Sequence, residues 1–150
     1  MLYNVNRYFI ASVIILLAIG NAVIDHLYAP IGIETTPPLI IVTTAAIVFN
    51  KQKFYLYFQM LIVYLPVAIN DVGIKLFGGG IHDLEGLLWI HLLLFAGLIP
   101  AFIILLISTL SNKNAGILKQ ITSLLFFISL IIIHLFIFEK LGLGRAYPIN

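Results

Sequence analysis

The side chains of this sequence that could do chemistry stand near one end of several long apolar segments. Asp25 and His26 lie about one turn before the end of the first such segment. His91 is near the start of a later segment, and His134 is near the end of the last one. At 1.5 Å per residue, all four lie within roughly 5–12 Å of the same membrane boundary. Because burying ionisable groups in lipid costs several kcal/mol, we expect them to face a shared interior or a water-filled cavity.

A second group of polar residues lies in the connection Asn70–Gly86, which holds three consecutive glycines followed by His82, Asp83 and Glu85. Consecutive glycines allow backbone conformations that other residues avoid, including close approach to a ligand. The same residues also fit a plain flexible connection whose acidic side chains favour the start of the next helix. The sequence leaves both interpretations open.

Imidazole nitrogens and carboxylate oxygens together make a zinc-type site. The candidate metal ligands are His26, His82, Asp83, Glu85, His91 and His134. The candidate catalytic residues are Asp25, His82, Asp83 and Glu85. A divalent metal bound there would turn a bound water into a nucleophile. Haem is an alternative cofactor, with His91 and His134 as its two ligands.

The composition indicates the class of protein in which these polar side chains would lie. The chain has 150 residues, of which 62% are hydrophobic and 9% charged, whereas a soluble domain carries about 25% charged residues. We therefore expect one membrane-embedded domain, residues 1–150, and exclude a soluble enzyme and a nucleic-acid-binding protein. The sequence contains no cysteine, which excludes disulfides, thiolate nucleophiles and cysteine-ligated metals.

Five segments are candidates to cross the bilayer, which needs about 20 mostly apolar residues per helix. They run over 8–28, 31–50, 54–70, 87–110 and 118–138. The second is apolar over 39–50 and becomes long enough only with the stretch from Ile31. Thr36 before Pro37 and Pro38 suggests an N-cap and a first helical turn there. A cleaved signal peptide is an alternative for the first segment. The expected fold is an all-α transmembrane bundle with five spans.

The charges predict the orientation of that bundle. With a cytoplasmic N-terminus, one side receives Arg7, Lys51, Lys53, Lys113 and Lys119. The opposite side receives Lys75, Lys140, Arg145, Asp25, Glu34, Asp71, Asp83, Glu85 and Glu139. Because cytoplasmic loops are enriched in Lys and Arg, this distribution favours an outer C-terminus in a bacterial inner membrane.

Three functions fit a five-span chain with an outward-facing acidic and histidine-containing layer. The first is a non-catalytic component of a larger inner-membrane assembly, with membrane lipids and partner subunits or further copies of the chain as neighbours. The second is a metal-dependent enzyme that acts on a lipid or lipid-linked substrate at the outer leaflet. The third is translocation of an ion or small solute by an oligomer.

Overall fold

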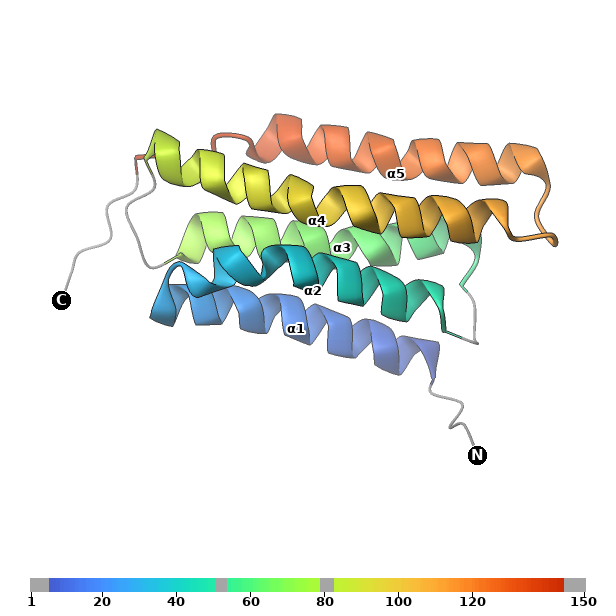
Figure 1. Ribbon diagram of the computed structural model, residues 1–150, viewed down its shortest axis with the longest axis horizontal. Coiled ribbons are helices and arrows are strands. Elements are labelled where there is room, and N and C mark those ends of the chain that lie inside the picture. The colour runs from blue at the N-terminus through green and yellow to red at the C-terminus, as the bar shows by residue number, and fades with distance from the viewer. Residues whose placement is uncertain (1–5, 51–53, 79–82, 145–150) are drawn as a thin grey trace.

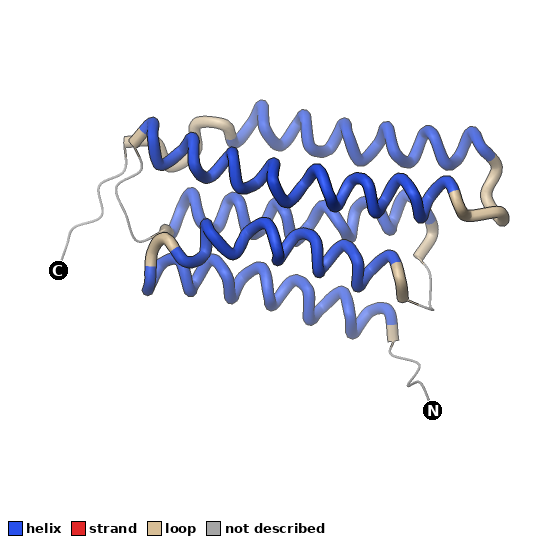
Figure 2. The backbone as a smooth tube through the Cα atoms, viewed as in Figure 1, coloured by secondary structure: helices blue, strands red, loops and turns tan. Residues whose placement is uncertain are grey.

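The computed structural model of the chain describes residues 6–50, 54–78 and 83–144. These residues form five α-helices and no strand (Figures 1 and 2). The helices are α1 (Arg7–Tyr28), α2 (Ile31–Val48), α3 (Leu56–Phe77), α4 (Leu84–Leu110) and α5 (Ile117–Phe138). Each is long and apolar enough to cross a membrane, which confirms the prediction of an all-helical bundle with five candidate spans.

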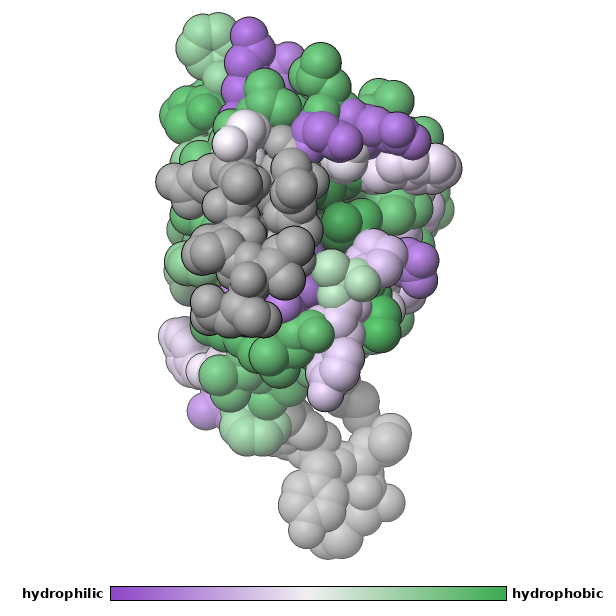
Figure 3. Space-filling view, turned by 90° about the vertical axis from the view of Figure 1, so that its left-hand side faces the viewer, coloured by the Kyte–Doolittle hydropathy of each residue, from purple (hydrophilic) through white to green (hydrophobic). Residues whose placement is uncertain are grey.

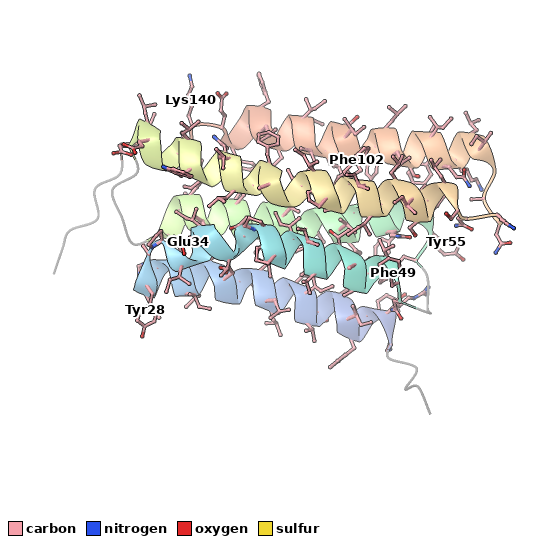
Figure 4. All side chains as sticks on the ribbon, in the orientation of Figure 1. Tyr28, Glu34, Phe49, Tyr55, Phe102 and Lys140 are labelled. Carbon is pink, nitrogen blue, oxygen red and sulfur yellow. The ribbon has the colours of Figure 1, made fainter. Side chains whose placement is uncertain are left out.

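Successive helices run in opposite directions, so that α1, α3 and α5 end where α2 and α4 begin (Figure 1). α3 contacts α1, α2 and α5, while α4 packs mainly against α2. At the shared end lie Tyr28, Glu34 and Lys140, and at the opposite end lie Phe49 and Tyr55 (Figure 4). We call the end with Tyr28, Glu34 and Lys140 the α3-C end of the bundle, because the C-terminus of α3 lies there.

The second helix begins earlier than the sequence indicates. Thr36 is not an N-cap, because α2 starts at Ile31 and continues through Pro37 and Pro38. A carboxylate oxygen of Asp25 on α1 accepts a hydrogen bond from the backbone N–H of Ile33, at 3.2 Å. It thereby supplies an acceptor to the first turn of α2, where the N–H groups have no partner within the helix. The Thr36 hydroxyl instead donates to the Gly32 carbonyl inside the helix, at 2.9 Å.

The third helix ends later than the sequence indicates. We expected its span to stop at Asn70 and a loop to follow, but α3 continues to Phe77. The expectation fails because the charges of Asp71 and Lys75 mimic the end of an apolar segment. In the fold the two residues lie one turn apart on the same helix and are buried. Residues 79–82, which include His82, lie outside the described part of the chain.

The interior of the bundle combines an apolar core with buried polar side chains. Its apolar core includes Met60, Val63, Leu94, Leu105 and Phe127. Gln59, Thr109, Gln120 and Ser123 are buried toward the opposite end, whereas the buried ionisable side chains Asp25, Asp71, Lys75 and His134 lie toward the α3-C end. Figure 3 looks onto that end and shows hydrophilic surface beside hydrophobic side chains.

Candidate functional site

An ion pair is buried inside the bundle. Asp71 and Lys75 stand at positions i and i+4 of α3, with 2.8 Å between Lys75 Nζ and Asp71 Oδ2, and both side chains are 0% exposed. Transferring two charges out of water costs several kcal/mol each, so such a pair requires further hydrogen bonds around it. The surrounding helices supply them.

The Lys75 ammonium has three N–H groups, and each finds an acceptor on a different helix. Besides Asp71 on its own helix, Nζ donates to the carbonyl oxygen of Phe138 on α5, at 3.1 Å. Its third contact is Nε2 of His91 on α4, at 3.0 Å. Because an ammonium has three donors and no acceptor, Nε2 of His91 must accept, and its proton lies on Nδ1. Lys75 thereby links α3 to α4, although these two helices pack sparsely.

The Asp71 carboxylate receives a second donor from α5. Nε2 of His134 lies 2.9 Å from Oδ2 of Asp71, the same oxygen that Lys75 contacts. The Tyr64 hydroxyl lies 3.3 Å from the other ring nitrogen of His134, Nδ1. If Asp71 is ionised and His134 neutral, Nε2 donates to the carboxylate and Nδ1 accepts from the Tyr64 hydroxyl. The rings of Tyr64 and His134 also meet edge to face, at 5.8 Å between centroids.

These contacts make one continuous hydrogen-bonded chain of five side chains, which we call the relay: Tyr64, His134, Asp71, Lys75 and His91. Its middle members are buried, while its two ends are half-buried. Tyr64 and Lys75 are eleven positions apart on α3, which corresponds to about 16 Å along the helix axis. The relay therefore extends from the α3-C end to roughly the middle of the bundle.

One acceptor of the relay is unused. Oδ1 of Asp71 is buried and has no hydrogen-bond partner among residues 6–50, 54–78 and 83–144. Every N–H of Lys75 is used and Oδ2 carries two donors, so Oδ1 keeps lone pairs for a further hydrogen-bond donor.

A second, uncharged network fixes the other side of α3. The Asn21 amide nitrogen of α1 donates to Oδ1 of Asn70, at 2.7 Å, and to the Gly32 carbonyl, at 2.8 Å. The Asn70 amide nitrogen donates to the Thr36 hydroxyl, at 2.9 Å. Because Asn70 and Asp71 are neighbours on one helix, these bonds to α1 and α2 set the rotation of α3 that directs Asp71 toward α5.

Asp25 lies on α1, next to the start of α2, and is not a member of the relay. Its side chain is 1% exposed and contacts the first turn of α2, where the positive end of the helix dipole favours a carboxylate. A Cβ on Gly32 would lie 2.3 Å from the Asp25 Cβ, so the glycine allows the close approach of the two helices. The geometry gives Asp25 a positioning role at the start of α2.

The remaining sequence candidates lie at the surface of the α3-C end. Asp83 caps α4, because its Oδ1 accepts from the Gly86 N–H at 2.7 Å. Glu85 is exposed in the first turn of that helix. His26 is also exposed, and its Nδ1 contacts the Phe77 carbonyl at the end of α3. These three side chains have local structural partners or face outward, and the structure joins none of them to the relay.

The described residues contain no group of three or more His, Asp or Glu side chains able to hold a metal ion. The physical reason lies in the contacts of His91 and His134, two of the candidate metal ligands. Nε2 of His91 accepts from Lys75, and Nε2 of His134 donates to Asp71. A tethered ammonium therefore sits between the imidazole and the carboxylate that a metal would need. The expectation of a metal centre gains no support from this part of the chain, and His82 lies outside it.

Sequence reasoning missed Tyr64, Asp71 and Lys75 as site residues, while it did select His91 and His134. A signal for the missed pair was present, because an acidic and a basic residue four positions apart suit one helix face. The residues that follow Asp71 are mostly apolar up to Phe77 and could have extended the span.

Comparisons of the chain with protein families, with curated proteins and with solved structures found no match. The function is therefore argued from the geometry of the relay.

Proposed function

We propose that this chain is an integral membrane protein that transfers protons through the relay, which is a form of the translocation function. The observation that supports it is the unbroken series of hydrogen bonds through Tyr64, His134, Asp71, Lys75 and His91. Chains of ionisable residues inside membrane helices are typical of proton pathways. Every link joins a nitrogen or oxygen that can donate or accept a proton.

The proton steps balance along the relay. A proton that reaches Nδ1 of His134 makes an imidazolium, which passes its Nε2 proton to Asp71 and becomes neutral again. Lys75 passes a proton to Nε2 of His91 and regains one from the protonated Asp71. His91 then releases its Nδ1 proton, so that one proton has entered and one has left. Both imidazoles are now in the opposite tautomer, and each ring must turn over before the next proton passes. No charge larger than one unit accumulates in the buried cluster, which keeps the desolvation cost low.

The side of the membrane that the relay serves follows from the charges at the two ends of the bundle. Arg7, Lys113 and Lys119 are exposed or half-buried at the end opposite the α3-C end. The acidic residues Glu34, Asp83, Glu85 and Glu139 are exposed at the α3-C end. By the positive-inside rule, the N-terminus is cytoplasmic and the relay lies in the outer half of the bilayer. This orientation, like the bacterial inner membrane as location, is part of the proposal.

A role as a component of a larger membrane assembly stays a prediction and is compatible with proton transfer. The relay ends near the middle of the bundle, so in this arrangement it opens toward one side. A partner subunit or a second copy that supplied the other half would make the chain the proton-handling part of a complex.

The test uses the full chain reconstituted in liposomes that contain a pH-sensitive dye. A potassium diffusion potential drives protons inward, and the rate of dye response measures the flux. We expect wild-type protein to give a flux above that of empty liposomes. Asp71→Asn should reduce it to the background level, because the amide cannot take up a proton at the centre of the relay. Glu34→Gln is the matched control at the same end of the bundle.

Two results would overturn the proposal. One is a wild-type flux equal to that of empty liposomes. The other is an Asp71→Asn flux equal to that of the wild type, because the central acid would then carry no protons.

A further inference from the structure

The face of α3 that carries the relay continues toward the opposite end of the bundle. Tyr57, Tyr64 and Asp71 recur every seven residues, and seven residues are just under two turns, so all three lie on one face. The Tyr57 hydroxyl lies 2.6 Å from the hydroxyl of Thr122 on α5. Polar pairs between α3 and α5 therefore occur at both ends of this interface.

The Tyr57–Thr122 pair has a defined direction of donation. The Thr122 hydroxyl lies 2.8 Å from the Leu118 carbonyl in its own helix and donates to it. The Tyr57 hydroxyl therefore donates to Thr122 and keeps its own lone pairs for another donor. Tyr57 is the second residue of α3, and eighteen positions separate it from Lys75, about 27 Å along the helix. That length approaches the ~30 Å thickness of the hydrocarbon core.

Two apolar residues interrupt this face. Met60 follows Tyr57 by three positions and Leu61 follows it by four, and both precede Tyr64 by one turn, so both lie between the two tyrosines on the same side of the helix. Met60 is fully buried and Leu61 is half-buried. The gap covers two turns, about 10 Å. On α5 the Phe126 ring meets the Tyr57 ring edge to face, at 6.0 Å between centroids.

We propose that protons pass between the relay and the opposite end of the bundle along this α3–α5 interface, with Tyr57 and Thr122 as its far terminus and Met60 and Leu61 as its apolar barrier. The inference rests on the proposed function and adds the second half of the path within one chain. Each hydroxyl takes up one proton as it gives up another, so the path stores no charge. Water that enters beside Leu61 would bridge the two tyrosines.

The test compares five variants with the wild type in the liposome assay. Leu61→Asn should raise the flux about tenfold, which corresponds to a barrier lowered by ~1.4 kcal/mol. Tyr57→Phe should lower it by a similar factor, because the terminal hydroxyl is lost. Leu125→Asn on the exposed face of α5 and Tyr55→Phe at an exposed tyrosine are the matched controls. Asp71→Asn reports on the proposed function independently.

The outcomes separate the two proposals. If Asp71→Asn removes the flux while Leu61→Asn and Tyr57→Phe behave like their controls, the path is wrong and the relay stands. If Asp71→Asn leaves the flux intact, both proposals fall. Should Leu61→Asn prevent folding, Tyr57→Phe alone decides, because its loss of a single hydroxyl preserves the ring contact with Phe126.

Discussion

At the scale of single residues, Lys75 shows how a membrane interior can hold a charge. Its three donors are all used, on Asp71, His91 and the Phe138 carbonyl. A buried pair of this kind adds little net stability compared with apolar residues, but the loss of one partner leaves an uncompensated charge. This asymmetry gives a direct prediction.

Lys75→Met should destabilise the protein by about 3–5 kcal/mol, because Asp71 would remain buried without its counter-charge. Adding Asp71→Leu to that variant should recover much of the loss, since no charge would then be buried. Unfolding in detergent micelles, followed by circular dichroism, measures both. The exposed Lys140→Met is the control. A double variant no more stable than Lys75→Met would contradict the importance of the ion pair.

The two histidines of the relay should have opposite tautomers. Nε2 of His91 accepts from Lys75, so its proton is on Nδ1, whereas Nε2 of His134 donates to Asp71. Nitrogen chemical shifts of imidazole-labelled protein, at a pH where both rings are neutral, distinguish the two forms. Assignment uses His91→Gln and His134→Gln, each of which removes one set of signals. The same tautomer on both rings would refute the proton assignment of the relay.

At the scale of helices, close approach is what brings the polar residues into contact. A Cβ on Gly97 of α4 would lie 2.9 Å from the Pro37 Cα of α2, and one on Gly73 of α3 would lie 2.6 Å from the Ala22 Cβ of α1. Small residues at such interfaces let membrane helices pack through their backbones. The hydrogen bonds of Asn21 and Asn70 depend on the same spacing between α1 and α3.

Gly73→Ala should separate α1 from α3 and lower stability by about 1–3 kcal/mol, the usual cost of overpacking. Its neighbour at the clash is a methyl group, so Ala22→Gly in the same chain should restore the contact. Thermal unfolding of the two single variants and the double variant forms a cycle. If the double variant is as unstable as the sum of both singles, the two positions are not coupled and the predicted contact is wrong.

At the scale of the whole molecule, the uneven distribution of charge predicts the proposed orientation in the membrane. The chain contains no cysteine, so single cysteines report on topology without a background signal. A cysteine at Asn114, in the connection between α4 and α5, should resist an impermeant thiol reagent added outside intact cells. A cysteine at Glu34 should react. The reverse pattern would place the relay in the inner half of the bilayer.

Much of the fold is encoded in composition and run length. Five apolar segments separated by polar or proline-containing connections predict five helices, and the structure contains them. The positions of His91 and His134 along their segments also predict that the two residues lie at a similar depth. In the structure both contact the ion pair of Asp71 and Lys75. Helix ends were harder to predict, because Asp71 and Lys75 resemble the boundary of a span when their partners are unknown.

The sequence by itself determined the class of the molecule, the number of its helices and the layer in which His91 and His134 lie. Only the tertiary structure decided which polar groups meet. The physical reason is that these helices are apolar around most of their circumference, so the sequence pattern contains little information on which face turns inward. That rotation is fixed by contacts between distant segments, among them Asn21 with Asn70 and His134 with Asp71.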